Sequence, residues 1–142
     1  MTNLQLNWTS VEFAPPSPAA AIPITRVTAV TFAQGGELIE FAGDNNRYPV
    51  VMANNINRPR CSITSGDVAT LFGIAPGTSG SITATQADAL GAVGGSIVWT
   101  MTNAVHADTE ESGNWGRFAT ATATFRAYAS DGATNPLSFT RV

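Results

Sequence analysis

The one histidine of the chain, His106, lies close to three acidic residues, where acid-base or metal chemistry would first be sought. Imidazole and carboxylate groups bind metal ions and exchange protons. Asp108, Glu110 and Glu111 also fit an exposed acidic loop, which HADTEESGNWG (106–116) resembles in composition. No serine stands in a pattern typical of a catalytic nucleophile. We therefore predict no catalytic residue, no metal site and no cofactor.

Cys61 is the one cysteine, so no intramolecular disulfide can form. It begins CSIT, a short segment with the character of a strand. A cysteine in such a context is more often a small core residue than a reactive nucleophile. The fold must then be held by packing and backbone pairing.

The segment GDNNRYP (43–49) contains clustered Asp and Asn side chains, but it lacks the spacing and terminal Glu of a calcium loop. We interpret it as a turn that leaves Arg47 and Tyr48 free for subunit contacts, where Arg and Tyr are enriched. Trp8 and Trp115 are further contact candidates, or alternatively a sugar-binding face. Trp99 falls on the apolar side of an alternating strand and is predicted to be core.

Charged residues make up only 12% of the 142 residues, and every basic residue is an arginine. Typical globular proteins are about 25% charged. Depletion of Lys and Glu is typical of surfaces packed against neighbours, so we predict an assembling protein. The net charge of −3 argues against tight nucleic-acid binding but is compatible with letting nucleic acid pass.

The N-terminus predicts an extended arm rather than a leader or a membrane span. Leu4, Leu6 and Trp8 alternate with polar residues, and three prolines follow within APPSPAAAIP. Proline cannot donate a ladder hydrogen bond, so this stretch is expected to be a spacer. We predict an arm and spacer over 1–23 and a single β-sandwich domain over 24–142. Deletion of residues 1–18 is expected to leave that domain folded.

Alternating residues over 24–33 and 37–42 predict a hairpin turning at Gly35-Gly36. Residues 43–60 are then expected to form a long contact-forming loop or a small separate hairpin.

A short helix is predicted after Ser65 or Asp67, because Val68, Leu71 and Phe72 are spaced along one helical face and Gly73 follows. The rest of the chain predicts strands, including 80–89, 96–105 and the last residues from Leu137. The fold class is therefore all-β, a β-sandwich or rolled sheet with one short α-helix, an N-terminal arm and a long loop.

The stretch RFATATATFRAY (117–128) predicts a strand with two distinct faces. Ala119, Ala121, Ala123, Phe125 and Ala127 form a thin apolar face suited to the core. Between them, threonines form a hydroxyl face with aromatic ends, suited to water or a partner.

With these features the chain resembles the phage tail tube proteins of siphophage type and related virion components. The resemblance is carried by the N-terminal arm, GELIEFAGDNNRYP, SGDVATLFGI, APGTSG and RAYASDGATNPLSF. It implies a β-sandwich that assembles into hexameric rings stacked as a tube, with other tail proteins as partners. It also implies a place in the virion after assembly in the host cytoplasm, without a membrane.

In such a tube DNA passes through the channel without specific binding, and a wall of hydroxyls and carboxylates would suit this. Glu37, Glu40 and Asp88 are the candidate lumen carboxylates. Leu4, Leu6, Trp8, Arg47, Tyr48 and Trp115 are the candidate subunit contacts. The alternatives are a capsid decoration protein and a carbohydrate-binding or receptor-binding β-sandwich.

Overall fold

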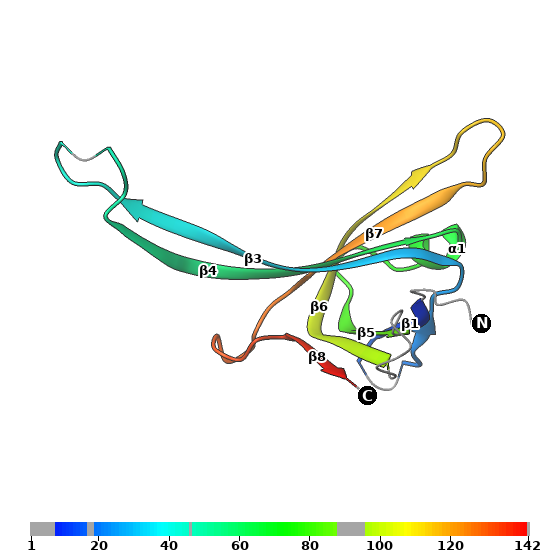
Figure 1. Ribbon diagram of the computed structural model, residues 1–142. Coiled ribbons are helices and arrows are strands. Elements are labelled where there is room, and N and C mark those ends of the chain that lie inside the picture. The colour runs from blue at the N-terminus through cyan, green and yellow to red at the C-terminus, as the bar shows by residue number, and fades with distance from the viewer. Residues whose placement is uncertain (1–7, 17–18, 46, 88–95, 142) are drawn as a thin grey trace, which may run out of the picture.

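The computed structural model describes residues 8–16, 19–45, 47–87 and 96–141 as an all-β protein with one short helix, which confirms the predicted fold class. Figure 1 traces the elements in chain order. They are β1 (Trp8–Ala14), β2 (Ile22–Pro23), β3 (Val27–Phe41), β4 (Val51–Ser65), α1 (Val68–Phe72), β5 (Ser79–Ala87), β6 (Ser96–Ser112), β7 (Thr120–Ala127) and β8 (Leu137–Arg141). Within the described ranges, no helix has the length and apolar character to cross a bilayer.

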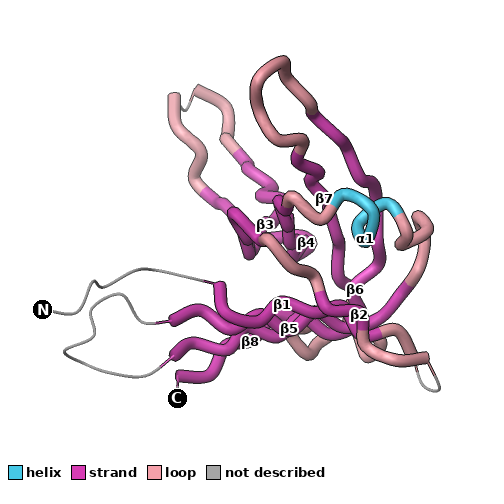
Figure 2. The backbone as a smooth tube through the Cα atoms, turned by 90° about the vertical axis from the view of Figure 1, so that its right-hand side faces the viewer, coloured by secondary structure: helices cyan, strands magenta, loops and turns pink. Residues whose placement is uncertain are grey.

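The strands form one antiparallel sheet that rolls over at β6. The order is β2-β1-β5-β6-β7-β4-β3, and β8 also pairs with β6. The first part of β6 pairs with β5 and β8, whereas Ala104–Ser112 pairs with β7. β6 therefore belongs to two layers: β2, β1, β5 and β8 on one side, and β7, β4 and β3 on the other (Figure 2).

The core lies between these two layers. Phe13, Ile82 and Met101 come from the first layer. The second supplies Cys61, Ile63, Ala121, Ala123 and Phe125, all essentially buried. The predicted apolar face of 117–128 is thus confirmed over its buried part, since small alanines let the opposite layer approach closely. Trp99 is half-buried, with its ring stacked 5.3 Å from that of Phe32.

The N-terminal segment differs from the expected free arm. β1 pairs with β5 through Val11↔Ala84 and Phe13↔Ile82, and both Val11 and Phe13 are buried. Residues 8–14 are therefore a strand of the body, and removing residues 1–18 would strip part of the core. Of the expected arm and spacer over 1–23, residues 1–7 and 17–18 lie outside the described residues, and Ile22–Pro23 forms β2, which pairs with β1.

The predicted turn at Gly35-Gly36 is wrong. Both glycines lie inside β3, opposite Arg58 and Asn57 of β4. The chain reverses instead over 42–50, so residues 51–60 of the segment expected as a loop or small separate hairpin are part of the long strand β4. The glycines allow an extended conformation as well as a turn, and the continuing pairs on β4 decide between them.

The short helix is confirmed between Asp67 and Gly73. The Ser65 hydroxyl accepts a hydrogen bond from the backbone N–H of Asp67 (2.9 Å) as the chain leaves β4. Leu71 is the buried residue of this helix, while Phe72 is exposed. The helix therefore packs on the core through Leu71, with partly buried Val68 beside it.

Candidate assembly surfaces

A hydroxyl-rich face covers the outer side of the layer formed by β6, β7, β4 and β3. Residues directly opposite each other on paired strands project to the same face. Three rows cross the layer in this way: Glu110, Thr122, Thr64, Ala29; Asp108, Thr124, Ser62, Thr31; and Val105, Arg126, Arg60, Ala33. The hydroxyls of Thr64 and Thr122 are 3.1 Å apart, which places them side by side. This surface is the hydroxyl face below.

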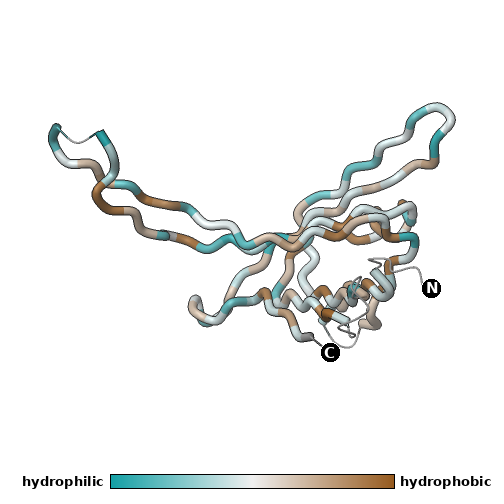
Figure 3. Tube along the Cα trace, viewed as in Figure 1, coloured by the Kyte–Doolittle hydropathy of each residue, from teal (hydrophilic) through white to brown (hydrophobic). Residues whose placement is uncertain are grey.

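The second surface is a long hairpin arm, residues 35–58 of β3 and β4, which extends away from the body in Figure 1. β4 pairs with β7 only over 60–65, so most of the arm is paired only with itself. Large apolar side chains on it are 46–62% exposed: Leu38, Ile39, Phe41, Val50, Val51, Met52 and Ile56. Figure 3 shows this apolar character on both strands of the arm.

Both faces of the arm carry apolar groups. Ile39, Phe41 and Val51 lie on the side that continues the hydroxyl face, since β3 alternates without interruption from Thr31. Leu38 and Met52 lie on the other side. A hairpin that exposes so much apolar surface on both faces is typical of a contact surface.

The third surface is the wing, residues 107–124 of β6 and β7, which projects from the opposite end of the layer (Figure 1). Its tip carries two fully exposed aromatic side chains, Trp115 and Phe118. The sequence placed Trp115 correctly in a loop. Such aromatic anchors at a projecting tip are typical of a contact site.

The layer has two free edges among the described residues. β3 pairs only with β4, and β6 beyond His106 pairs only with β7. Each strand of β6-β7-β4-β3 runs antiparallel to its neighbour. β6 and β3 therefore run in opposite directions, so β3 of one copy could pair antiparallel with β6 of the next.

His106 is buried in β6 rather than in an exposed acidic loop, which corrects the sequence interpretation. Its Nε2 lies 3.0 Å from the carbonyl oxygen of Asp108 and 2.6 Å from Oγ1 of Thr109. Its ring packs 5.1 Å from that of Phe125. The nearby acidic side chains point to solvent instead. Within the described ranges, no group of three His, Cys, Asp or Glu residues could hold a metal ion.

Cys61 is fully buried in β4 opposite Phe125, as its strand context predicted. Burial raises the pKa of its thiol to about 12, because the thiolate loses its hydration. The thiol is therefore protonated at neutral pH and shielded from reagents.

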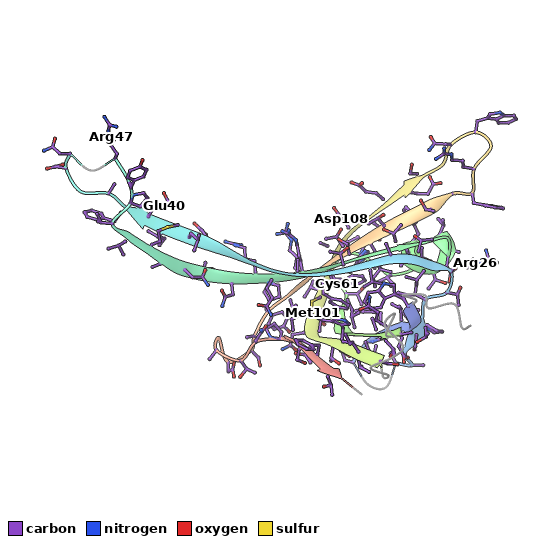
Figure 4. All side chains as sticks on the ribbon, viewed as in Figure 1. Arg26, Glu40, Arg47, Cys61, Met101 and Asp108 are labelled. Carbon is purple, nitrogen blue, oxygen red and sulfur yellow. The ribbon has the colours of Figure 1, made fainter. Side chains whose placement is uncertain are left out.

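The candidate subunit contacts fall at separate places. Arg47 and Tyr48 lie exposed at the end of the arm, as Figure 4 shows for Arg47. Trp115 is at the wing tip. Trp8 is half-buried at the start of β1, with its ring centroid 6.1 Å from that of Phe32. Leu4 and Leu6 lie outside the described residues.

The candidate lumen carboxylates do not share one surface. Glu37 continues the hydroxyl face and lies 3.4 Å from Arg58, whereas Glu40 is on the opposite face of the arm because the two differ in strand parity. Asp88 lies outside the described residues. Two further carboxylates join Glu37 on the hydroxyl face, Asp108 and Glu110 of β6, which were expected in a loop. The spacing of two residues between Asp108 and Glu110 was the sequence signal that both lie on one face of a strand.

The comparisons with known proteins concern the fold alone. No family model matches the chain, and no curated protein matches its sequence. Among solved structures, a chain of the anti-feeding prophage baseplate, described as 6-fold symmetrised, matches with a TM-score of 0.60 and 9% identity. The match covers 99% of this chain and 97% of that one. The fold is therefore that of a chain from a phage tail-like particle.

Two further structures agree. A chain from the tail of an empty GTA particle, refined with C6 symmetry, matches with a TM-score of 0.55 and 10% identity, covering 92% of this chain and 94% of that one. A chain of the anti-feeding prophage cap, described as a tube-terminating cap, matches with a TM-score of 0.55 and 9% identity, covering 100% and 95%. All three come from tail, baseplate or cap assemblies.

Proposed function

We propose that this protein is a structural, non-enzymatic subunit of a phage tail or tail-like particle, and specifically a tube subunit. The observation that carries the proposal is the layer β6-β7-β4-β3 with its two free edges, in a fold shared with chains of such particles. Pairing β3 of one copy with β6 of the next is a head-to-tail contact. Such a contact closes into a ring when the rotation between copies permits. The 6-fold and C6 symmetry of the matched assemblies supports a ring of six.

In this proposal the arm and the wing join neighbouring rings, because they project from opposite ends of the same layer. The exposed apolar groups of the arm would be covered in the stacked tube, together with Arg47 and Tyr48. Trp115 would serve the same purpose at the wing tip. Leu4, Leu6 and Trp8 remain proposed contacts at the N-terminus.

The hydroxyl face is the proposed wall of the channel. Neutral hydroxyls give DNA few strong contacts, and Glu37, Asp108 and Glu110 offset the charges of Arg58, Arg60 and Arg126 on the same face, so these six charges give phosphates no net attraction. Glu40 and Asp88 remain candidates whose position would depend on the assembled tube. DNA would pass without specific binding, in a virion assembled in the host cytoplasm.

Electron microscopy of the purified protein in negative stain tests this function. A tube subunit forms rings or tubes. Discrete particles that attach to capsids would instead indicate a decoration protein, and monomers that bind glycans through Trp115 would indicate a binding module.

A variant with a shortened arm tests the stacking role of the arm. Glu37 and Ile56 are directly paired, so residues 38–55 can be replaced by Asn-Gly, which closes a two-residue hairpin. We expect this variant to keep the folded body, seen by circular dichroism, and to lose stacked tubes. Tubes as long as those of the wild type would contradict the proposed stacking role of the arm.

A further inference from the structure

Two arginines lie directly opposite each other on the hydroxyl face. Arg60 of β4 and Arg126 of β7 are register partners, and both side chains are exposed. Like charges at directly opposite positions destabilise a sheet. Within the described ranges the one ion pair is Arg58 with Glu37, so neither Arg60 nor Arg126 has a carboxylate partner among those residues.

Two carboxylates on the same face also form no ion pair with any described residue. Asp108 and Glu110 of β6 stand opposite Thr124 and Thr122, and both are exposed. Asp108 is one diagonal step from Arg126 across the β6–β7 ladder, yet the described residues form no ion pair there. Both acids lie along the free edge of β6, beyond His106.

The path from Arg60 to the other free edge is open. β3 is the outermost strand, and its residues on this face are small: Ala29, Thr31, Ala33 and Gly35. Arg60 stands opposite Ala33, so no bulky side chain separates its guanidinium from the β3 edge. A strand added at that edge would lie two strand spacings from β4, about 10 Å. An arginine on one strand and an acidic side chain on the other can span this distance together, because each extends toward the other.

We propose that Arg60 crosses Ala33 and binds Asp108 or Glu110 on β6 of the adjacent copy, forming an ion pair across the ring junction. This rests on the proposed edge-to-edge pairing of β3 and β6. A shift of one residue in the pairing of β3 with the neighbouring β6 would turn the hydroxyl face of that copy to the other side of the sheet. A shift of two residues only exchanges Asp108 for Glu110 as the partner of Arg60. Arg58 is already held by Glu37 at 3.4 Å, and Arg126 lies one strand farther from the β3 edge, so Arg60 is the unpaired arginine nearest to that edge.

The pairing also explains why two like charges stay side by side. Once Arg60 turns toward the neighbouring copy, its charge is neutralised and its repulsion with Arg126 falls. The interaction selects partner orientation as well, because the head-to-tail contact joins arginine to acid. The reverse contact, β3 against β3, would bring Arg60 toward Arg60.

Charge reversal tests this inference. One variant carries Arg60→Glu, and the second carries Asp108→Arg with Glu110→Arg. Each alone places like charges at every junction, and we expect the protein concentration needed for assembly to rise by about tenfold or more. A mixture of the two variants can alternate around an even-membered ring, where every junction again joins opposite charges. We expect the equimolar mixture to assemble near the wild-type concentration.

Recovery of assembly in the mixture distinguishes a contact between copies from a contact within one chain. A contact within one chain would stay disrupted in both variants, because mixing does not change either chain. Arg26→Glu makes the same change of charge at an exposed position before β3 and should assemble normally. Circular dichroism checks that each variant is folded. If both variants assemble alone as the wild type does, or if both fail and their mixture stays unassembled, the ion pair is overturned.

The same proteins distinguish a rival occupant, the phosphates of DNA. Binding of a short DNA duplex is followed by fluorescence anisotropy for wild type and Arg60→Glu. We expect no Arg60-dependent binding, and binding that Arg60→Glu abolishes would overturn the proposal. If the wild type itself never forms rings or tubes, the proposed function fails. If the wild type assembles and the charge-reversed variants assemble equally well, only the ion pair fails.

Discussion

The rings of Phe13 and Phe125 lie 5.3 Å apart and join the two layers of the sheet. Phe13 comes from β1 and Phe125 from β7, and both are completely buried. The N-terminal strand therefore contributes to the same core as the alternating strand 120–127. The body needs β1 to be complete.

Replacing Phe13 with Ala should destabilise the protein by about 3–5 kcal/mol, because a large buried ring is lost and a cavity remains. Phe118→Ala is the matched control, since that ring is fully exposed at the wing tip and should change stability by less than about 0.5 kcal/mol. Urea denaturation below the assembly concentration measures both. Equal stability of the Phe13 variant and the wild type would contradict the place of β1 in the core.

Gly80 in β5 is a site where even one methyl group should be destabilising. A Cβ at this position would collide with the carbonyl oxygen of Ala14 and lie 2.9 Å from the Phe13 ring. We expect Gly80→Ala to cost about 1–3 kcal/mol, because backbone of β1 cannot move aside easily. Gly113→Ala is the control, since its new methyl would lie 3.3 Å from the flexible Glu111 side chain and in ordinary contact with Ala119 at 3.9 Å. Thermal unfolding of both variants below the assembly concentration compares the two effects.

The buried thiol of Cys61 predicts a pH dependence of stability. Its pKa is about 12 in the fold against 9.0 for an ordinary thiol. Between these values the unfolded chain loses a proton that the folded chain retains, so unfolding becomes more favourable as pH rises. The free energy of unfolding should fall above pH 9 by at most about 1.4 kcal/mol per pH unit. Below pH 9 the group should contribute no slope.

Cys61→Ala provides the comparison, since it lacks the thiol and should lose this part of the alkaline slope. In the wild type at pH 8, a thiol reagent should label Cys61 only after a denaturant is added. Rapid labelling of the native protein would show that the thiol is accessible.

Alternation along the sequence predicted the faces of single strands well. The buried positions Ala121, Ala123 and Phe125 follow from period two, and the short helix follows from its spacing and its flanking residues. These features depend on neighbours in the sequence. Local patterns therefore suffice for them.

The path of the chain between strands was less predictable. Gly35-Gly36 has the composition of a turn, yet fifteen-residue strands pair straight through it. The reversal occurs at 42–50, where the sequence also contains turn-forming residues. Two competing turn signals are decided by pairing with a distant strand, which a local pattern does not contain.

The charged rows of the hydroxyl face depend even more on distant residues. Arg60, Arg126 and Asp108 come from three strands, and only their register places them on one surface. His106 was misplaced for a related reason. An acidic segment looked like a loop, although a register shift between His106 and Asp108 turns His106 to the core and leaves Asp108 and Glu110 facing solvent.

The end of the arm should be open to proteases until the protein assembles. Arg47 and Tyr48 are exposed within the turn at 42–50, and exposed loop tips are preferred cleavage sites. Trypsin should cut the unassembled protein after Arg47, and mass spectrometry identifies the fragment that ends there. In stacked tubes the same bond should be protected, because a neighbouring copy covers the arm. Arg47→Gln should remove this fragment from the unassembled protein, which assigns the cut. Cleavage after Arg47 at the same rate in tubes and in free subunits would exclude the end of the arm from the contact between rings.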